Sequence, residues 1–194
     1  MAPADPLPPP DPRWASLDET LRRHPCADAK EERDVATIRA FLRQHPSDAH
    51  LRSQRAGHLT GSGFVLDAEG KHVLLLHHRR LDRWLQPGGH GEGETDPRLV
   101  ALREVEEETG LGTASLLPFP SPALLDVDVH AIPARPDEPE HLHLDLRYGF
   151  QAAAGAQARL SEESKALRWV PLEEALPDAD SSLVRALRKL GRRS

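Results

Sequence analysis

Four carboxylates crowd into five consecutive positions of one short segment, and this segment constrains the fold more than any other part of the chain. Residues 88–111 read GGHGEGETDPRLVALREVEEETGL. Asp96 or Thr95 can cap a helix here, Pro97 suits its first turn, and Gly110 can end it. The sequence therefore predicts a short helix with a defined beginning and end.

The acidic side chains of this predicted helix repel one another. At 3.6 residues per turn, Glu104, Glu107 and Glu108 share one face. Three apolar side chains point the other way, toward a core: Leu99, Leu102 and Val105. Like charges at these spacings cost about 0.2–0.5 kcal/mol per pair, and the negative end of the helix dipole adds to that cost. A divalent cation would reverse the penalty, because Mg²⁺ prefers oxygen ligands. The alternative is a solvated acidic face, which is what most charge runs are.

The segment resembles the signature of the Nudix hydrolase superfamily, in which a Gly precedes a Glu by six positions and Arg-Glu-apolar-x-Glu-Glu-x-Gly-apolar follows. Residues 103–111 match throughout, whereas Glu94 lies one residue earlier than the spacing from Arg103 requires. This departure concerns the bracing of the loop more than metal binding. The resemblance implies an α/β fold, namely an α/β/α sandwich with a mixed sheet over residues 56–194.

The same resemblance implies a reaction and roles for residues. The reaction is divalent-metal-dependent hydrolysis of a diphosphate linkage in a nucleoside diphosphate derivative by metal-activated water. Glu107 and Glu108 would bind Mg²⁺ or Mn²⁺, and Glu104 would bind the metal or orient the water. The Gly88 carbonyl would complete the metal shell, and Arg103 would pair with a neighbouring carboxylate. A rival hypothesis is a catalytically inactive Nudix-like nucleotide-binding or regulatory module.

The general base is expected outside the signature, on a loop. Glu162 is favoured because it precedes a predicted strand at 166–170. For each candidate the alternative is an ordinary charged side chain on a solvent-exposed loop. Three alternatives stay open: Glu138, Glu140 and Glu163. His90 is predicted to contact a phosphate or to be a surface-loop histidine. Trp84 is predicted to stack on a base or to serve in packing.

A second pattern, HLHLDLRY, alternates as a strand does. Its polar residues share one face, which is interpreted as a substrate-pocket wall beside the signature helix, as a solvated sheet face, or, least favoured, as a zinc site: His141, His143, Asp145 and Arg147. This order, together with Trp-Leu-Gln-Pro-Gly-Gly-His at 84–90, resembles a subset of Nudix hydrolases.

The chain divides into three parts by composition. Residues 1–13 are proline-rich and predicted to be disordered, and residues 14–55 form a helical extension with its longer helix at Asp28–Arg43. We expect the extension to pack against the Nudix domain at 56–194, with a substrate or dimer contact as the alternative. Strands are predicted at 58–66, 71–77, 124–132 and 141–153.

Charge and composition restrict the partners. The net charge of −6 gives no reason to expect a nucleic-acid or membrane surface, and no apolar run is as long as a membrane span. A single cysteine, Cys26, excludes an internal disulfide framework and fits the reducing cytoplasm. The expected partner is a small nucleotide-type substrate, and a homodimer is left open.

Overall fold

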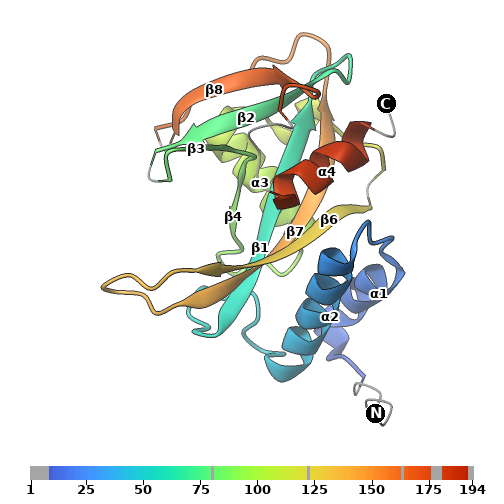
Figure 1. The fold of residues 1–194 in the computed structure, drawn as a ribbon, viewed down its shortest axis with the longest axis vertical. Helices are drawn as coiled ribbons and strands as arrows, with labels where there is room; N and C mark the ends of the chain where they lie inside the picture. The colour runs from blue at the N-terminus through green and yellow to red at the C-terminus, as the bar shows by residue number, and fades with distance from the viewer. Residues whose placement is uncertain (1–8, 80, 122, 163, 176–180, 192–194) are drawn as a thin grey trace.

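The computed structural model describes residues 9–79, 81–121, 123–162, 164–175 and 181–191. One mixed sheet forms the centre of the molecule, with a helix on each of its faces and two further helices along one side (Figure 1). This is the α/β/α sandwich with an N-terminal helical extension that the sequence predicts.

The helices and strands lie close to their predicted positions. The helices of the described chain are α1 (Ala15–Arg23), α2 (Ala29–Gln44), α3 (Pro97–Thr109) and α4 (Ser181–Gly191), with short 3-10 turns at Pro12–Trp14 and Thr113–Ser115. The strands are β1 (Gly57–Leu66), β2 (His72–His78), β3 (Arg83–Leu85), β4 (Gly88–His90), β5 (Leu116–Pro118), β6 (Leu124–Ile132), β7 (His141–Ala152) and β8 (Ser164–Pro171).

Two long parallel strands, β1 and β7, hold the sheet together and pair from Gly57↔Leu142 to Leu66↔Gln151. The other edge of β1 is shared, since β2 pairs at its end and β4 pairs along Thr60–Ser62. The other edge of β7 is likewise shared between β5 and β6. The sheet therefore opens beside β4, next to the helix that carries the acidic signature.

The two faces of β1 differ in character, and this difference positions α3. A Cβ on Gly61 would lie 2.4 Å from the Pro97 carbonyl oxygen, and a Cβ on Gly63 would lie 2.4 Å from Val105 Cγ2. Only glycine lets the helix approach the strand this closely. Helix α3 thus covers the face that carries the β7 leucines, and α4 packs on the opposite face against Phe64 and other apolar residues. Figure 1 shows α3 and α4 on either side of the sheet.

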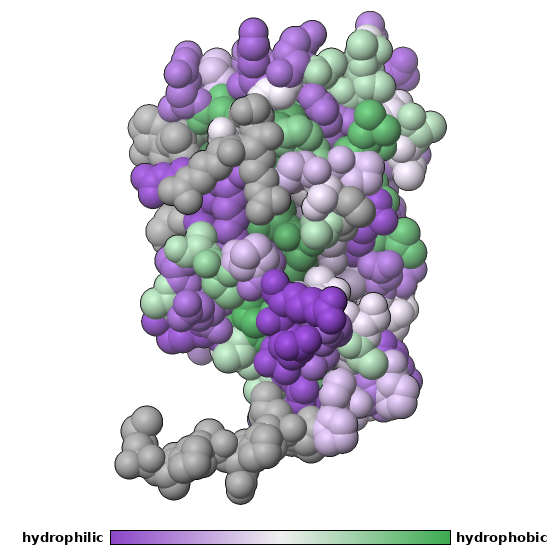
Figure 2. All heavy atoms as spheres, turned by 90° about the vertical axis from the view of Figure 1, so that its right-hand side faces the viewer, coloured by the Kyte–Doolittle hydropathy of each residue, from purple (hydrophilic) through white to green (hydrophobic). Residues whose placement is uncertain are grey.

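The extension packs on the domain, which confirms the favoured interpretation. Trp14, Leu21, Ile38 and Leu42 are buried in the same core as residues of α3 and β7. Figure 2 views this side of the molecule, and its lower part is mostly hydrophilic, as expected for helices whose apolar sides face inward.

Side chains from α2 and α4 also cover the free edge of β6. The Val127 N–H donates to Glu31, and its carbonyl accepts from Arg185 at 2.6 Å. Lys189 donates to the Leu125 carbonyl at 3.0 Å, and Lys30 donates to the Val129 carbonyl at 3.4 Å. An exposed strand edge is a site of unwanted pairing. Helix α2 of the extension and helix α4 together therefore take the place of a neighbouring strand.

Two sequence predictions need correction. The sequence predicts a disordered tail that ends at residue 13, but Pro12–Trp14 form a 3-10 turn. Arg13 of this turn donates to the Pro46 and Ser47 carbonyls at 3.3 and 3.1 Å. Residues 1–8 of the predicted tail lie outside the described residues. Leu99 was predicted to face the core, but this residue is 48% exposed because α3 packs on the sheet through Pro97, Ala101 and Val105, which lie about half a turn away around the helix. Within the described ranges, none of the helices combines the length and hydrophobicity of a transmembrane span.

Candidate active site

Helix α3 begins and ends where the sequence predicts. The Asp96 side chain accepts from the Arg98 N–H at 2.9 Å, and Pro97 opens the first turn. Gly110 ends the helix with φ of 69°, a left-handed conformation that glycine adopts without steric cost. This fixes the rotation of the helix and therefore the direction of its acidic face.

Two carboxylates of that face meet the backbone of β4. Glu108 is buried and accepts from the Gly88 N–H at 2.9 Å. Glu104 packs against Gly89 so closely that a Cβ there would lie 2.6 Å from its carboxyl carbon. The third carboxylate, Glu107, is exposed on 57% of its side chain. Two of the three carboxylates thus lie against β4, and the third lies beside them toward solvent.

Arg103 ties this acidic group to the loop before the helix. Its guanidinium lies 2.9 Å from Glu104 Oε1, 3.4 Å from Glu107 Oε2 and 3.3 Å from Glu92 Oε2. It also donates to the His90 carbonyl at 2.5 Å. The pairing of Arg103 with neighbouring carboxylates agrees with the sequence prediction. A guanidinium with several fixed partners holds their oxygens in one arrangement.

The displaced glutamate of the signature has a different partner. Glu94 accepts from the Thr95 and Asp96 N–H groups at 2.6 and 2.8 Å, so it braces the start of α3 rather than the arginine. Glu92 pairs with Arg103 instead, from a backbone with a positive φ of 51°. Two neighbouring residues therefore divide the bracing, which sequence spacing alone did not reveal.

The predicted base candidates lie at two separate places. The loop that carries Glu162 passes the end of α3, where the Arg159 N–H donates to the Thr109 carbonyl at 2.6 Å. Glu162 itself is exposed, and its carbonyl accepts from Arg79 at 3.2 Å. Glu138 lies elsewhere, 3.6 Å from Arg52. Glu140 is exposed, and Glu163 lies outside the described residues.

Trp84 is engaged in packing contacts. Its ring stacks on His77 with centroids 5.0 Å apart, and the Arg168 guanidinium lies 5.1 Å from the ring centroid. Both contacts match the packing role that the sequence left open beside base stacking.

The polar face of β7 is on the opposite side of the sheet from α3. Thr60 and Ser62, which face away from α3, donate to Asp145 at 3.0 and 2.8 Å. The prediction that this face lies beside the signature helix is therefore wrong. Strand alternation grouped the four side chains correctly, but it does not tell which face a helix covers.

Asp145 and Arg147 are buried in an ion-pair network. Arg147 lies 2.8 Å from Asp145, 3.2 Å from Asp126 and 3.4 Å from Asp128, and Asp126 also pairs with Arg185 of α4 at 2.8 Å. Burial alone would lower the pKa of Arg147, but the three carboxylates raise it, so the guanidinium stays charged. These contacts explain both residues as a link between the sheet and α4.

The other two residues of that face, His141 and His143, lie near the opposite end of the strand pair. His143 Nε2 is 3.3 Å from His90 Nε2, and the ring of His141 stacks on His58 with centroids 5.1 Å apart. His58 was not singled out in the sequence, although its pairing with His143 follows from the parallel register of β1 and β7. The structure therefore joins His90, just after the glycines, to the histidines of β7.

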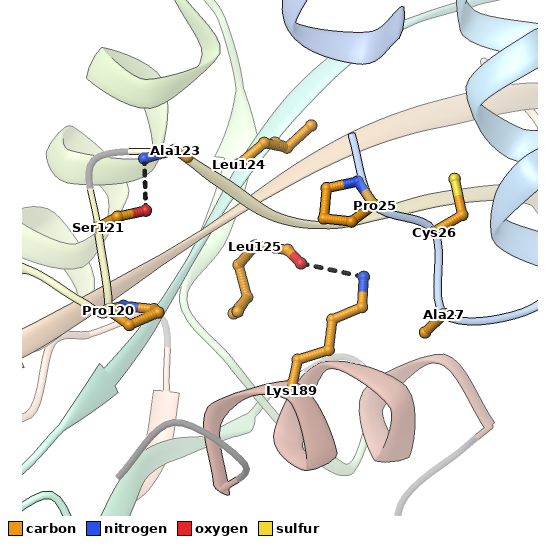
Figure 3. A pocket seen from close by; sticks show the side chains of 9 residues that line it. All are labelled: Pro25, Cys26, Ala27, Pro120, Ser121, Ala123, Leu124, Leu125 and Lys189. Atoms are coloured by element: carbon orange, nitrogen blue, oxygen red, sulfur yellow. Dashed lines mark hydrogen bonds between the residues drawn. The ribbon is translucent and has the colours of Figure 1, made fainter. Parts of the chain in front are cut away.

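A cavity of about 280 Å³ lies away from these groups, between the extension and α4. Figure 3 shows Cys26 and Pro25 on one side of it, and Lys189 donating to the Leu125 carbonyl on the other. Burial raises the pKa of the Cys26 thiol, and Glu31 adds to this effect. None of the predicted site residues lines this cavity.

Comparisons with known proteins agree with the signature and the fold. A family model described as NUDIX domain matches residues 58–190. A Streptomyces rubellomurinus CMP-5'-(N-acetyl-N-hydroxy-3-aminopropyl)phosphonate hydrolase is 28% identical over 120 residues, which cover 57% of this chain and 50% of that protein. A human protein, nucleoside diphosphate-linked moiety X motif 6, is 34% identical over 82 residues, which cover 41% of this chain and 25% of that protein. The chain thus spans half or less of the length of these curated relatives.

A solved structure shows the same fold. The C. elegans Ap4A hydrolase in a binary complex superposes with a TM-score of 0.58 at 21% identity, covering 69% of this chain and 95% of that chain. At this identity the likeness concerns the fold. The family model covers well over half of the sequence, and its signature residues form one constellation on α3 and β4, so the chain belongs to the Nudix family.

Proposed function

We propose that this chain is a divalent-metal-dependent pyrophosphohydrolase that cleaves a diphosphate linkage in a nucleoside diphosphate derivative. The observation that carries the proposal is the placement of Glu104 and Glu108 against β4, with Glu107 beside them on α3 and Arg103 in contact with Glu104 and Glu107. An inactive binding module has no need for three carboxylates that repel one another. Their retention favours an enzyme over that alternative.

The donors at this place suit Mg²⁺ or Mn²⁺. They are carboxylate oxygens, which hard divalent cations prefer, and glycine at position 89 lets the Glu104 carboxylate lie against the backbone. Glu104, Glu107 and Glu108 would hold the cation, with the Gly88 carbonyl as a further ligand. When bound, the cation would neutralise diphosphate charge and lower the pKa of a coordinated water.

The chain's own residues would position the reacting groups. Arg103 keeps Glu104 and Glu107 in place through contacts of 2.9 and 3.4 Å. Glu162, on the loop that passes the end of α3, is proposed as the base that accepts a proton from the attacking water. Water then adds to one phosphorus, the bridging P–O bond breaks, and the products are a monophosphate and a second phosphorylated fragment.

The surroundings of the other predicted substrate ligands decide how strongly each is favoured. His90, His141 and His143 lie on the face of the sheet that α3 does not cover, so they are less favoured as substrate ligands than the sequence alone suggests. Trp84, Asp145 and Arg147 are less favoured as substrate ligands, because each already has close partners. We also propose that the chain belongs to the subset of Nudix hydrolases with the Trp-Leu-Gln-Pro-Gly-Gly-His motif. We propose that it is located in the cytoplasm, where Cys26 would stay reduced.

The test compares two neighbouring glutamates. Glu107→Gln should lower Mg²⁺-dependent release of monophosphate from nucleoside diphosphate derivatives by at least about 100-fold, since it removes a metal ligand. Glu106→Gln is the matched control, because Glu106 is exposed on the same helix and is not one of the three proposed ligands. A Glu107→Gln protein that folds and turns over at the wild-type rate would remove the basis of the proposal.

A further inference from the structure

A group of histidines occupies the face of the sheet that α3 does not cover. His58 of β1, His90 of β4 and His143 of β7 each offer a ring nitrogen, and these nitrogens all lie within 4.8 Å of one another. His58 and His143 are direct neighbours across the parallel strand pair, while His90 pairs with Thr60, two residues farther along β1. Three strands thus bring three imidazoles together, and the pairing of the strands fixes their positions.

The most buried member of the group has unsatisfied nitrogens. His58 is 1% exposed, and neither of its ring nitrogens has a hydrogen-bond partner among the described residues. The Gln54 carbonyl lies near enough to raise its pKa but outside hydrogen-bond geometry. A buried polar group without a partner costs about 1–3 kcal/mol, so its persistence requires an explanation.

The adjacent His141 extends this pattern. Its Nδ1 lies 2.9 Å from the Pro139 carbonyl, which fixes the proton there, and its Nε2 lies 3.9 Å from the Glu138 carboxylate. Nε2 is buried and makes no hydrogen bond in the described structure. A backbone carbonyl on one ring nitrogen is the usual way that a protein orients a metal-binding histidine.

The rings of the group lie against one another, since the centroid of the His58 ring is 5.0 Å from that of His143 and 4.9 Å from that of His90. A neutral imidazole carries a free lone pair, which is the form that binds a metal.

The spacing of the nitrogens is compatible with one ion. Two nitrogens bound at 2.0–2.1 Å to a tetrahedral Zn²⁺ lie roughly 3.4 Å apart. His90 Nε2 and His143 Nε2 are 3.3 Å apart, and small rotations of the rings would bring His58 to the same distance. We propose that His58, His90 and His143 form a second metal site, for a divalent transition metal of the Zn²⁺ class, with the ring of His141 packed beside it.

This site differs from the carboxylate site of α3 in the chemistry of its ligands. Imidazole nitrogens suit Zn²⁺, Ni²⁺ or Cu²⁺, whereas the oxygens of Glu104, Glu107 and Glu108 suit Mg²⁺ or Mn²⁺. The two groups lie on opposite sides of β4 and are linked through the His90 carbonyl, which accepts from Arg103. A metal at the histidines would hold β1, β4 and β7 together behind the signature loop.

The competing explanation is a metal-free cluster, in which His90 and His143 share one N–H···N hydrogen bond and the rings stack. Metal retention distinguishes the two. The full chain, treated with chelator and then incubated with Zn²⁺ in excess Mg²⁺, is passed through a desalting column, and the retained zinc is measured by elemental analysis. Co²⁺ titration followed by visible absorption gives the affinity and the ligand geometry.

Wild-type protein should retain one zinc per chain, and Glu107→Gln should retain the same amount because its carboxylate belongs to the other site. His143→Gln and His58→Gln should each weaken Co²⁺ binding by roughly 100-fold or more, since even loss of an outer-shell partner costs 10–100-fold. His72→Gln, far along β2 and paired with Asp67, is the control for surface histidines.

Circular dichroism establishes that each variant is folded, and His143→Gln serves if the buried His58 does not tolerate substitution. No zinc retained by the wild type, or equal retention by the wild type and folded His143→Gln, would overturn the site. Loss of zinc in Glu107→Gln but not in His143→Gln would also overturn it, while leaving the carboxylate site of the proposed function in place.

Discussion

Substitution of Glu31 by glutamine tests whether the extension stabilises the domain by covering the edge of β6. Glu31 is fully buried, although it belongs to a surface helix. Its Oε1 accepts from the Val127 N–H at 3.1 Å, from Lys189 and from the His24 ring at 2.7 Å, and its Oε2 accepts from the Ala27 N–H at 2.7 Å. These four hydrogen-bond partners are all donors, and the Arg185 guanidinium lies 3.8 Å from Oε2 as a further cationic neighbour.

The magnitude follows from these contacts. A glutamine has one acceptor oxygen, so if that oxygen serves Val127 and Lys189, its NH₂ group faces the Ala27 N–H. Leaving a buried donor unsatisfied costs about 1–3 kcal/mol, and breaking a buried ion pair costs about 3–5 kcal/mol. Lys189 would still pair with Asp126 at 2.9 Å, which reduces the cost of losing its ion pair with Glu31. We therefore expect a loss of about 3 kcal/mol, a large fraction of the 5–15 kcal/mol of a typical domain.

Urea unfolding followed by tryptophan fluorescence measures this loss. Of the three tryptophans of the chain, Trp14 is 1% exposed and sits in the extension, so its exposure on unfolding contributes to the change in emission. Glu32→Gln is the matched control, because the next residue along α2 is exposed, and its effect should stay within about 0.5 kcal/mol. Light scattering would detect association through an uncovered β6 edge.

A Glu31→Gln protein as stable as Glu32→Gln would refute the reasoning. It would mean that the neutral amide satisfies the same donors, or that water replaces the lost acceptor.

Two further predictions concern buried charges. Arg147→Met should lower the free energy of unfolding by about 3–5 kcal/mol in a urea titration, because it leaves three buried aspartates without their common partner. A small loss of stability together with a raised KM would contradict this and would indicate that Arg147 binds the substrate. Burial acts to raise the pKa of Asp18, but hydrogen bonds from Arg43 and Arg39 outweigh it and lower that pKa to about 2. Because the folded value lies below the unfolded value, Asp18 contributes about 2 kcal/mol above pH 5, and this contribution is lost as the pH falls from about 4 to 2. In Asp18→Asn the free energy of unfolding should therefore change less with pH between about pH 4 and pH 2 than in the wild type. An unchanged pH dependence would contradict the assignment.

Much of the architecture could be predicted from local patterns. Asp96, Pro97 and Gly110 fixed the ends of α3 because caps and left-handed glycines act over a few residues. The alternation of β7 grouped His141, His143, Asp145 and Arg147 on one face because the side-chain period of a strand is two.

Other features depended on contacts between distant segments, which no local pattern encodes. The choice of sheet face for α3, the burial of Arg147 under α4, and the exchange of roles between Glu92 and Glu94 all arise from tertiary packing. His58 joined His90 and His143 only through the parallel register of β1 with β7. The sequence by itself determined the elements and the acidic face of the helix, because capping, periodicity and charge are local. The tertiary structure decided which charges are buried and which histidines meet, because these depend on how strands far apart in the chain are paired.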